Sequence, residues 1–480
     1  MAKNSLLKNT LIVGGSRMCT ILITFATTIV LARLLTPSDF GTVAMCSIFL
    51  SIAQVLVESG LGGSIIYYKD TSEDDYHTVF WFNMVISVVL YIVLLLCSGI
   101  IADFYGVPIL ASIIKLCGLS IVVHSTCLIQ SSLLSKNLQF KTQTRILITS
   151  SILTAITVIT MAYVFNQKNM GIWALASQHL MLYFYQSILF IVKGHYRPKF
   201  VFKFNLLKKH WEFGSRLMGT SILHMIYQNM YVQLIGKVVE IGDAGYYNQA
   251  KKLNDVPMHV IQYPLERVLF PTLTHSTDFN GCTKVILNAF AFVLIPILFL
   301  GSVLAPYLVT IILGSKWGAS GWMLSIMFIG TIGASLENLN RSFIKATGQT
   351  GVLLKTDFVK RLVCIGIVIL CLKWGIKGVL CAFVFNGFLG WMFNCLALNR
   401  ITNSGILVQI GIVVRTVLFS TMAMGAAYWV DSLVELSVWG HLLVLASVYL
   451  AVIAVVIFGF RRKELKEMKK LLFKKKNQSK

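Results

Sequence analysis

Charge is scarce in this sequence, and acidic charge is scarcest. Only 13% of the 480 residues are charged, with 19 Asp and Glu against 42 Lys and Arg, whereas a soluble domain carries roughly 25% charged residues. This composition excludes a water-soluble globular fold. Regular alternation of apolar and polar residues is also missing, which excludes an outer-membrane barrel. The chain instead contains apolar runs of about 20 residues from end to end, each long enough to cross ~30 Å of hydrocarbon.

The sequence also lacks the short motifs of common enzymes. It contains no GxSxG, HExxH, P-loop or DxD-bearing soluble segment, and these motifs carry nucleophiles, metals or phosphates. Its ten cysteines form no CxxC pair, and most lie within apolar runs, as core-filling residues do. We therefore expect no enzymatic activity, no resident cofactor and no metal site.

The net charge of +23 does not indicate nucleic-acid binding, because of where the charge lies. The tail 461–480 holds ten Lys and Arg and two Glu, and most remaining cations lie in short loops on alternate sides of the apolar runs. Such a distribution is typical of a membrane protein with a tail that faces the anionic inner leaflet. Leu465, Met468 and Leu472 share one helical face, so we expect a surface-lying helix there, with a merely solvated tail as the alternative.

The apolar runs predict an all-α polytopic membrane protein with about fourteen transmembrane helices. The expected helices span residues 10–32, 41–61, 79–102, 109–133, 144–165, 171–192, 212–235, 246–273, 286–311, 320–342, 352–373, 377–398, 405–429 and 438–459. The two termini and the loops on their side together hold about 26 Lys and Arg, whereas the loops on the opposite side hold about six. Both termini are therefore predicted to be cytoplasmic. The acidic loop 69–75 is an exception on the cytoplasmic side.

An internal repeat divides the chain into two halves. The motif Gly15–Met18 recurs as Gly214–Leu217, and Asp39–Gly41 recurs as Asp243–Gly245. This repeated motif predicts two pseudo-symmetric six-helix lobes. The lobes would be related by an axis along the membrane normal, with a substrate path between them. The predicted order is an N-lobe at 1–192, a basic cytoplasmic linker at 193–210, a C-lobe at 211–400, two further helices in 401–460 and the tail 461–480.

Arg17 and Arg216 occupy equivalent positions in the two lobes. We expect both guanidinium groups to face a shared wet space and to bind an anionic headgroup such as a pyrophosphate, because guanidinium binds phosphate oxygens in a bidentate way. The alternative is that each arginine extends to the cytoplasmic headgroups. Glu58 is a lone acid near the end of the second apolar run, and its expected partner is Arg17. Single histidines such as His124 are expected to be packing residues.

The most polar of the expected helices is 246–273. Lys251 and Asp255 are four residues apart and should form an ion pair, which leaves Lys252 as a candidate ligand, with Arg267 as a further contributor. Three prolines in this range should let the helix bend beside a cavity. The alternative is a helix that starts at the periplasmic surface, with its lysines among the headgroups.

Charged residues further along should pair with one another. Glu337 and Arg341 are four residues apart and are expected to form an ion pair within one helix. Asp357 is expected to pair with Lys360 or Arg361 in a salt bridge at the membrane surface.

Four stretches of the sequence resemble one transporter family. Val30–Gly41 is similar to the end of the first span in polysaccharide flippases of the multidrug/oligosaccharidyl-lipid/polysaccharide (MOP) exporter superfamily. Thr78–Asn83, Gly245–Ala250 and Ile312–Trp317 resemble its O-antigen and teichuronic-acid branch. This resemblance implies two six-helix lobes with two extra helices, a cationic central cavity and a place in the bacterial inner membrane. It implies a flippase that moves polyprenyl-pyrophosphate-linked oligosaccharide to the outer leaflet, coupled to a proton or sodium gradient.

The partners implied by the resemblance are this lipid-linked glycan, the membrane lipids, a polysaccharide polymerase and a chain-length regulator. Three alternatives remain open. A multidrug extruder of the same fold would need uncompensated acids in its cavity, and a membrane polymerase would need a large outer loop. A flippase of peptidoglycan precursors is harder to separate from the sequence alone.

Overall fold

The computed structural model describes residues 2–58, 61–68, 70–168, 170–194, 196–262, 273, 278–402 and 406–460. Within these ranges the backbone alone is described for residues 2–11, 213, 216–217, 219–220, 223–224, 350 and 457–460. All regular structure in the described ranges is helical, and the chain divides into two compact units at Gly245.

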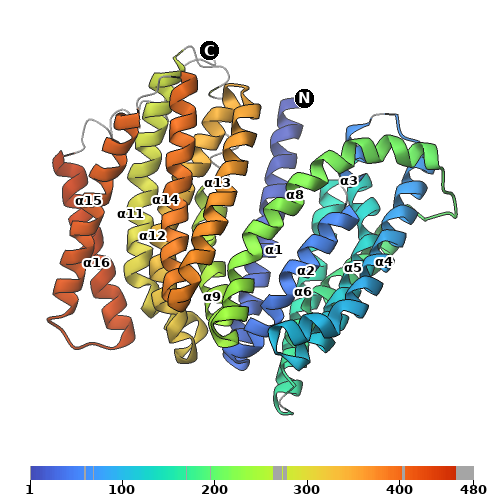
Figure 1. The fold of residues 1–480 in the computed structure, drawn as a ribbon, viewed down its shortest axis with the longest axis horizontal. Helices are drawn as coiled ribbons and strands as arrows, with labels where there is room; N and C mark the ends of the chain where they lie inside the picture. The colour runs from blue at the N-terminus through green and yellow to red at the C-terminus, as the bar shows by residue number, and fades with distance from the viewer. Residues whose placement is uncertain are drawn as a thin grey trace. The chain divides into compact units, whose positions relative to one another are not determined.

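Within the described residues, the first unit contains eight helices and the start of a ninth (Figure 1). They are α1 (Ala2–Leu34), α2 (Pro37–Glu58), α3 (Leu61–Tyr67), α4 (Glu73–Tyr105), α5 (Pro108–Lys136), α6 (Phe140–Asn166), α7 (Ile172–Lys193), α8 (Phe204–Val238) and the start of α9 (Ile241–Asn254). The second unit holds the rest of α9, a π-helical turn at Met258–Gln262, α11 (Phe279–Leu313), α12 (Gly318–Ala346), α13 (Thr350–Cys371), α14 (Gly375–Thr402), α15 (Ile406–Asp431) and α16 (Val438–Phe460).

The predicted fold class is confirmed. Each of the fourteen predicted ranges overlaps one of these helices. Eleven described segments are long and apolar enough to cross a membrane, and one of them, 351–402, contains both α13 and α14. The two remaining predicted ranges overlap α8 and α9, which are more polar and are not among these segments. The protein is a multi-pass membrane protein built of helices.

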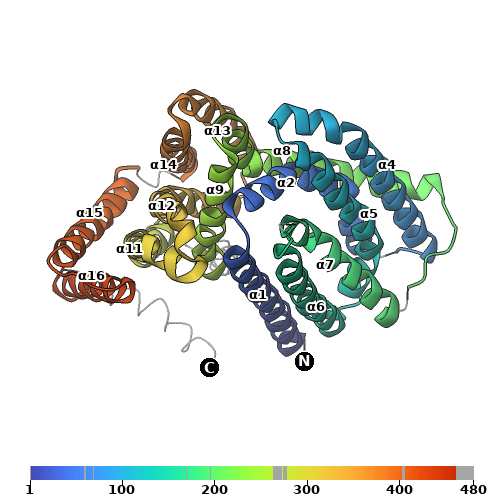
Figure 2. The same ribbon diagram turned by 90° about the horizontal axis from the view of Figure 1, so that it is seen from below.

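In the first unit, α5 lies at the centre and packs against both α4 and α7, while α6 packs against α7 and α1 (Figure 2). Buried apolar side chains of α2 and α5, including Met45, Val57, Ile113 and Ile121, form its main core. α8 packs along α2 and also contacts α3 and α4. The first compact unit therefore runs to Gly245, beyond the predicted lobe boundary in the linker, and the lobes of the repeat stay a prediction.

In the second unit, α12 packs between α11 and α14. A side chain at Gly333 would overlap the backbone at Gly387, and one at Gly387 would overlap the backbone of Gly330, so these glycines let α12 and α14 approach closely, as small residues do between membrane helices. α15 and α16 pack against each other and against α11. α15 and α16 correspond to the two helices that were predicted to lie outside the repeat.

Two glycines at equivalent positions of the repeat contact each other's helices. A Cβ atom at Gly41 would overlap the carbonyl oxygen of Ile241, and a Cβ at Gly245 would overlap the carbonyl oxygen of Pro37. The Cβ added at each glycine would thus overlap the carbonyl oxygen of the residue four positions before the other glycine. A two-fold relation between the start of α2 and the start of α9 would produce such a reciprocal contact, and the repeat inferred from the sequence stays a prediction.

The predicted helix 246–273 is interrupted at its first proline. α9 ends at Asn254, and a π-helical turn follows Pro257, because proline has no N–H with which to continue the helical ladder. Pro264 and Pro271 lie outside the described residues.

Candidate functional site

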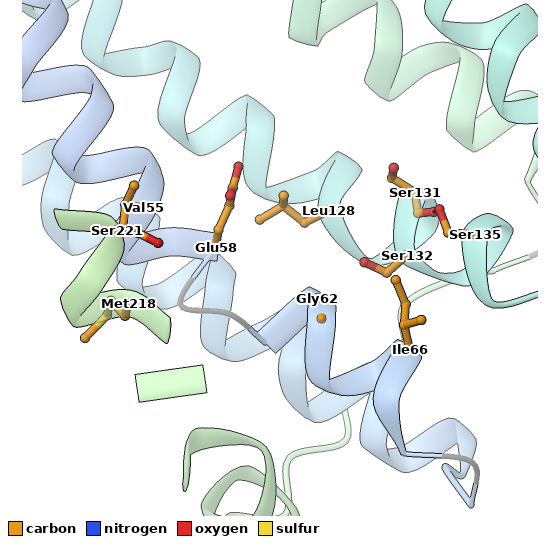
Figure 3. A pocket seen from close by; sticks show the side chains of 11 residues that line it. Val55, Glu58, Gly62, Ile66, Leu128, Ser131, Ser132, Ser135, Met218 and Ser221 are labelled. Atoms are coloured by element: carbon orange, nitrogen blue, oxygen red, sulfur yellow. The ribbon is translucent and has the colours of Figure 1, made fainter. Parts of the chain in front are cut away.

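The first unit contains a cavity of about 510 Å³, within the size range of small-molecule sites. Figure 3 shows the Glu58 carboxylate at the end of α2 and the side chains of α5 and α8 around this space. The lining residues are Val55, Glu58, Gly62, Gly63, Ile66, Leu128, Ser131, Ser132, Ser135, Met218 and Ser221. One wall is therefore hydroxyl-rich and another is apolar.

Local sequence explains how this space is formed. The chain restarts as α3 at Leu61, and Gly62 lies so close to α5 that a Cβ there would be 2.8 Å from the Ser132 Oγ. The glycines bring α3 against α5 and leave their own side of the cavity without side chains. On α6, Gln143 donates Nε2–H to the Oγ of Ser131 at 3.0 Å and to the Oγ of Ser135 at 3.1 Å, which fixes both hydroxyl groups.

The chemistry of the cavity suits a polyhydroxylated ligand. Serine hydroxyls donate and accept hydrogen bonds, a carboxylate accepts them, and the apolar wall can cover a sugar ring. The lining residues described here include no Lys or Arg, so this cavity by itself lacks the cations that a pyrophosphate needs.

The expected pair of Glu58 with Arg17 is wrong. Among the described residues, the Glu58 carboxylate lies 4.0 Å from Nε2 of His124, and it is 54% exposed. α1 packs along α6, and Arg17 on α1 is exposed. His124 packs against the ring of Tyr183 with centroids 4.2 Å apart.

The structure places the predicted cations of α9 as follows. The ion pair between Lys251 Nζ and Asp255 Oδ1 is confirmed at 2.7 Å. Lys252 is exposed on the same helix, as a ligand-binding side chain must be. Its predicted role in binding a headgroup stays a prediction.

Two of the predicted arginines fall outside what the structure describes. Arg216 lies in α8, but its side chain is not described, and Arg267 lies outside the described residues. Arg17 is exposed on α1 and belongs to none of the described ion pairs. Their convergence on one headgroup therefore stays a prediction.

The second unit contains a chain of ion pairs instead of the expected pair of Glu337 with Arg341. Arg341 Nη1 lies 2.9 Å from Asp357 Oδ2, Lys360 Nζ lies 2.9 Å from Asp357 Oδ1, and Lys360 also binds the Glu337 carboxylate. The predicted Asp357–Lys360 pair is confirmed, but it is buried, not exposed at a surface. Gly390 of α14 leaves room for Glu337, since a Cβ there would overlap the carboxylate.

The sequence reading missed a buried histidine. His210 is fully buried, with Nε2 2.9 Å from Asp75 Oδ1 and Nδ1 2.7 Å from Ser64 Oγ. Asp75 also accepts hydrogen bonds from the backbone N–H and the hydroxyl of Ser72, which form the N-terminal cap of α4. The signal was present in the sequence, because an acidic loop on the basic side of the membrane needs a basic partner.

Comparison with known proteins decides the family. A family model described as "Polysaccharide biosynthesis protein" matches residues 30–321, which is more than half of the chain. The chain belongs to this family. The match confirms the resemblance that Val30–Gly41 and Gly245–Ala250 indicated.

Three curated proteins are similar to the chain over about two thirds of their length. The chain is 26% identical over 341 residues to the lipopolysaccharide biosynthesis protein WzxC of Escherichia coli (strain K12), covering 69% of this chain and 68% of that protein. It is 26% identical over 346 residues to the teichuronic acid biosynthesis protein TuaB of Bacillus subtilis (strain 168), covering 70% of each. It is 23% identical over 333 residues to the succinoglycan biosynthesis transport protein ExoT of Rhizobium meliloti (strain 1021), covering 68% and 67%.

Solved structures show that this chain has the fold of the MATE transporters. A point mutant of the Vibrio cholerae MATE transporter VcmN superposes with a TM-score of 0.54 at 14% identity, covering 84% of this chain and 98% of that one. An inward-facing multidrug resistance MATE transporter of the MOP superfamily superposes with a TM-score of 0.52 at 12% identity, covering 80% and 96%. Identities this low establish the fold alone.

Proposed function

We propose that this protein is a flippase that moves polyprenyl-pyrophosphate-linked oligosaccharide units from the cytoplasmic to the outer leaflet of the bacterial inner membrane. The observation that carries the proposal is membership of a polysaccharide-biosynthesis family whose helices adopt a transporter fold. The relatives named for lipopolysaccharide, teichuronic acid and succinoglycan biosynthesis point to surface polysaccharide as the pathway. Both termini are cytoplasmic in this proposal, and the protein carries its substrate across without catalysing a reaction.

The two chemical parts of the substrate are assigned to different residues. Arg17 and Arg216, helped by Lys252 and Arg267, bind the pyrophosphate through charge-assisted hydrogen bonds. The serine-rich cavity beside Glu58 accepts sugar hydroxyls on the cytoplasmic side. The polyprenyl chain stays in the bilayer, and movement of one lobe against the other exposes the headgroup to the far side, driven by a proton or sodium gradient. A polymerase and a chain-length regulator would take over the product.

Neutralising both arginines tests the pyrophosphate assignment. In an encapsulated host that lacks its own copy of the gene, the wild-type protein restores surface polysaccharide, and the Arg17→Ala, Arg216→Ala double variant is expected to restore none. The measurement is surface polysaccharide per cell, normalised to the amount of the protein in the membrane. The matched control is Arg145→Ala, which removes an exposed arginine of α6 outside the proposed site and should restore wild-type amounts.

Full polysaccharide output from the double variant would overturn the assignment of the arginines. Accumulation of lipid-linked repeat units on the cytoplasmic face in the double variant would support it, because that is the species a blocked flippase leaves behind.

One observation favours a second function, extrusion of organic cations. The half-exposed carboxylate of Glu58 lines a cavity without Lys or Arg among its described residues, and an acid in such a cavity can hold a cation. Drug susceptibility separates the two functions. An extruder raises the tolerated concentration of cationic dyes when it is expressed and leaves surface polysaccharide unchanged, whereas a flippase does the reverse.

A further inference from the structure

The segment that joins α7 to α8 exposes three aromatic rings. Residues 196–203 are not helical, and α8 begins at Phe204. Phe200, Phe202 and Phe204 alternate along this stretch and are 90%, 52% and 72% exposed. These three exposed rings of one short segment are here called the phenyl edge.

Two lysines of the same segment pair with acidic residues at the start of α4. Lys199 Nζ lies 3.6 Å from the Glu73 carboxylate, and Lys203 forms an ion pair with Asp74. The acidic loop 69–75, which is the exception to the positive-inside distribution, therefore contains the residues that pair with the basic linker. These two lysines alternate in sequence with the three phenylalanines.

Backbone and ring contacts fix the segment in this orientation. The indole Nε1–H of Trp81 donates to the carbonyl oxygen of Lys199 at 2.8 Å, and the N–H of Lys203 donates to Thr78 Oγ1 at 3.1 Å. The ring of Phe200 stacks on Trp81 with centroids 4.5 Å apart. The exposure of the phenyl edge is therefore built into the fold of the first unit.

Three exposed cations accompany the phenyl edge. Lys193, Arg197 and Lys208 are all exposed, and none of them belongs to an ion pair among the described residues. Lys199 and Lys203 already have acidic partners, so these three remain available to an external anion.

The position of the segment in the chain identifies what covers it. α7 is one of the segments long and apolar enough to cross a membrane, and it ends at Lys193, so the phenyl edge lies at the end of a membrane span on the predicted cytoplasmic side. Aromatic side chains concentrate at the headgroup level of bilayers, and exposed Lys and Arg beside them attract the anionic lipids of the inner leaflet. Water would be a poor environment for three exposed phenyl rings.

We propose that the phenyl edge is a membrane-surface anchor: Phe200, Phe202 and Phe204 enter the boundary between headgroups and acyl chains of the cytoplasmic leaflet, while Lys193, Arg197 and Lys208 bind anionic phospholipid headgroups. The acidic loop holds the anchor through Lys199 and Lys203. The anchor fixes the entry of α8, and this role does not depend on which substrate the protein carries.

Photo-crosslinking in a defined bilayer tests the proposal. The full-length protein with p-benzoylphenylalanine in place of Phe202 is reconstituted into nanodiscs of equal phosphatidylglycerol and phosphatidylcholine, irradiated, and analysed by mass spectrometry. We expect lipid adducts on the linker peptide, with phosphatidylglycerol several-fold in excess over phosphatidylcholine. The matched control places the photoreactive residue at the half-buried Val201, where adducts should form within the chain.

A charge variant tests the lipid selectivity separately. Adding Arg197→Ser and Lys208→Ser to the Phe202 probe should bring the ratio of the two lipid adducts toward one while lipid adducts persist. The proposal is overturned if the probe at 202 gives no lipid adduct, if it gives the same adducts as the probe at 201, or if it links to another protein in native membranes. Equal amounts of the two lipid adducts with the cations intact would overturn the role of Lys193, Arg197 and Lys208. An unchanged melting temperature of each probe variant confirms that it is folded.

Discussion

Replacing Gly245 with alanine should destabilise the protein, and replacing Gly242, three residues earlier on the same helix, should not. The added Cβ at Gly245 would overlap the backbone carbonyl oxygen of Pro37, while a Cβ at Gly242 would have nothing within 4 Å. A backbone oxygen cannot rotate away, so the two helices must separate, at a cost of about 1–3 kcal/mol or more. At Gly242 alanine should instead stabilise the helix by about 0.5–1 kcal/mol. Thermal unfolding of the purified variants in one detergent measures both effects.

The partner glycine supplies a sharper test of the repeat. Gly41→Ala should cost as much as Gly245→Ala, because its Cβ would overlap the carbonyl oxygen of Ile241 in the same contact. Once either substitution has separated the helices, the other should cost little, so the double variant should lose clearly less stability than the sum of the single variants. Additive losses would show that the two glycines do not share a contact, and would count against the repeat.

The sequence was sufficient for the helices because the signal for a membrane helix lies in each run of residues by itself. It was also sufficient for Lys251 with Asp255, which are one turn apart on one helix. The sequence did not predict the partners of Glu337 and Arg341, which have the same spacing, because α13 packs beside them. Asp357 of α13 pairs with Arg341, and Lys360 of α13 pairs with Glu337. The spacing rule describes an isolated helix, and these residues lie between packed helices.

The remaining misses have the same physical origin. Glu58 and Arg17 were paired on charge alone, but which helices become neighbours depends on packing between residues far apart in the chain, and α1 packs on α6. The cavity beside Glu58 likewise needs α3, α5 and α8 brought together. The acidic loop 69–75 was visible in the sequence. Its partner was not recognised because acidic residues count little in predicting orientation, although they still pair with basic residues across the surface.

Removing the Asp75 carboxylate should destabilise the protein far more than removing that of its neighbour Asp74. In Asp75→Ala the buried Nε2 of His210 loses its acceptor and α4 loses half of its capping box. Breaking a buried pair on one side costs about 3–5 kcal/mol. Asp74 pairs with Lys203 at a partly exposed site, so Asp74→Ala should cost about 1 kcal/mol at most. The two melting temperatures, measured in the same nanodiscs, should therefore differ clearly.

Similar melting temperatures for Asp74→Ala and Asp75→Ala would contradict the buried site, because two exposed pairs would behave alike. The double variant Asp75→Ala, His210→Leu adds a control. If Asp75→Ala loses stability because the buried imidazole of His210 is left without an acceptor, replacing this imidazole with an apolar side chain should recover part of the stability.

The same site predicts how stability depends on pH. Burial lowers the pKa of His210 below its ordinary value, with Lys209 and Lys136 acting in the same direction, although the Asp75 carboxylate opposes them. The unfolded chain, with a histidine pKa of about 6.5, therefore binds the proton more readily than the folded protein does. The stability that His210 contributes is present above that pKa and is lost as the pH falls below it.

We therefore expect the melting temperature to fall between about pH 7 and pH 5, and His210→Gln, which cannot titrate, to fall less steeply over that interval. Asp75 remains in the variant, so the difference between the two slopes isolates the histidine. If His210→Gln keeps the full slope of the wild type, the imidazole is not the group that responds. If the wild type gains stability on acidification, His210 is buried as the charged imidazolium, and the carboxylate of Asp75 outweighs its burial.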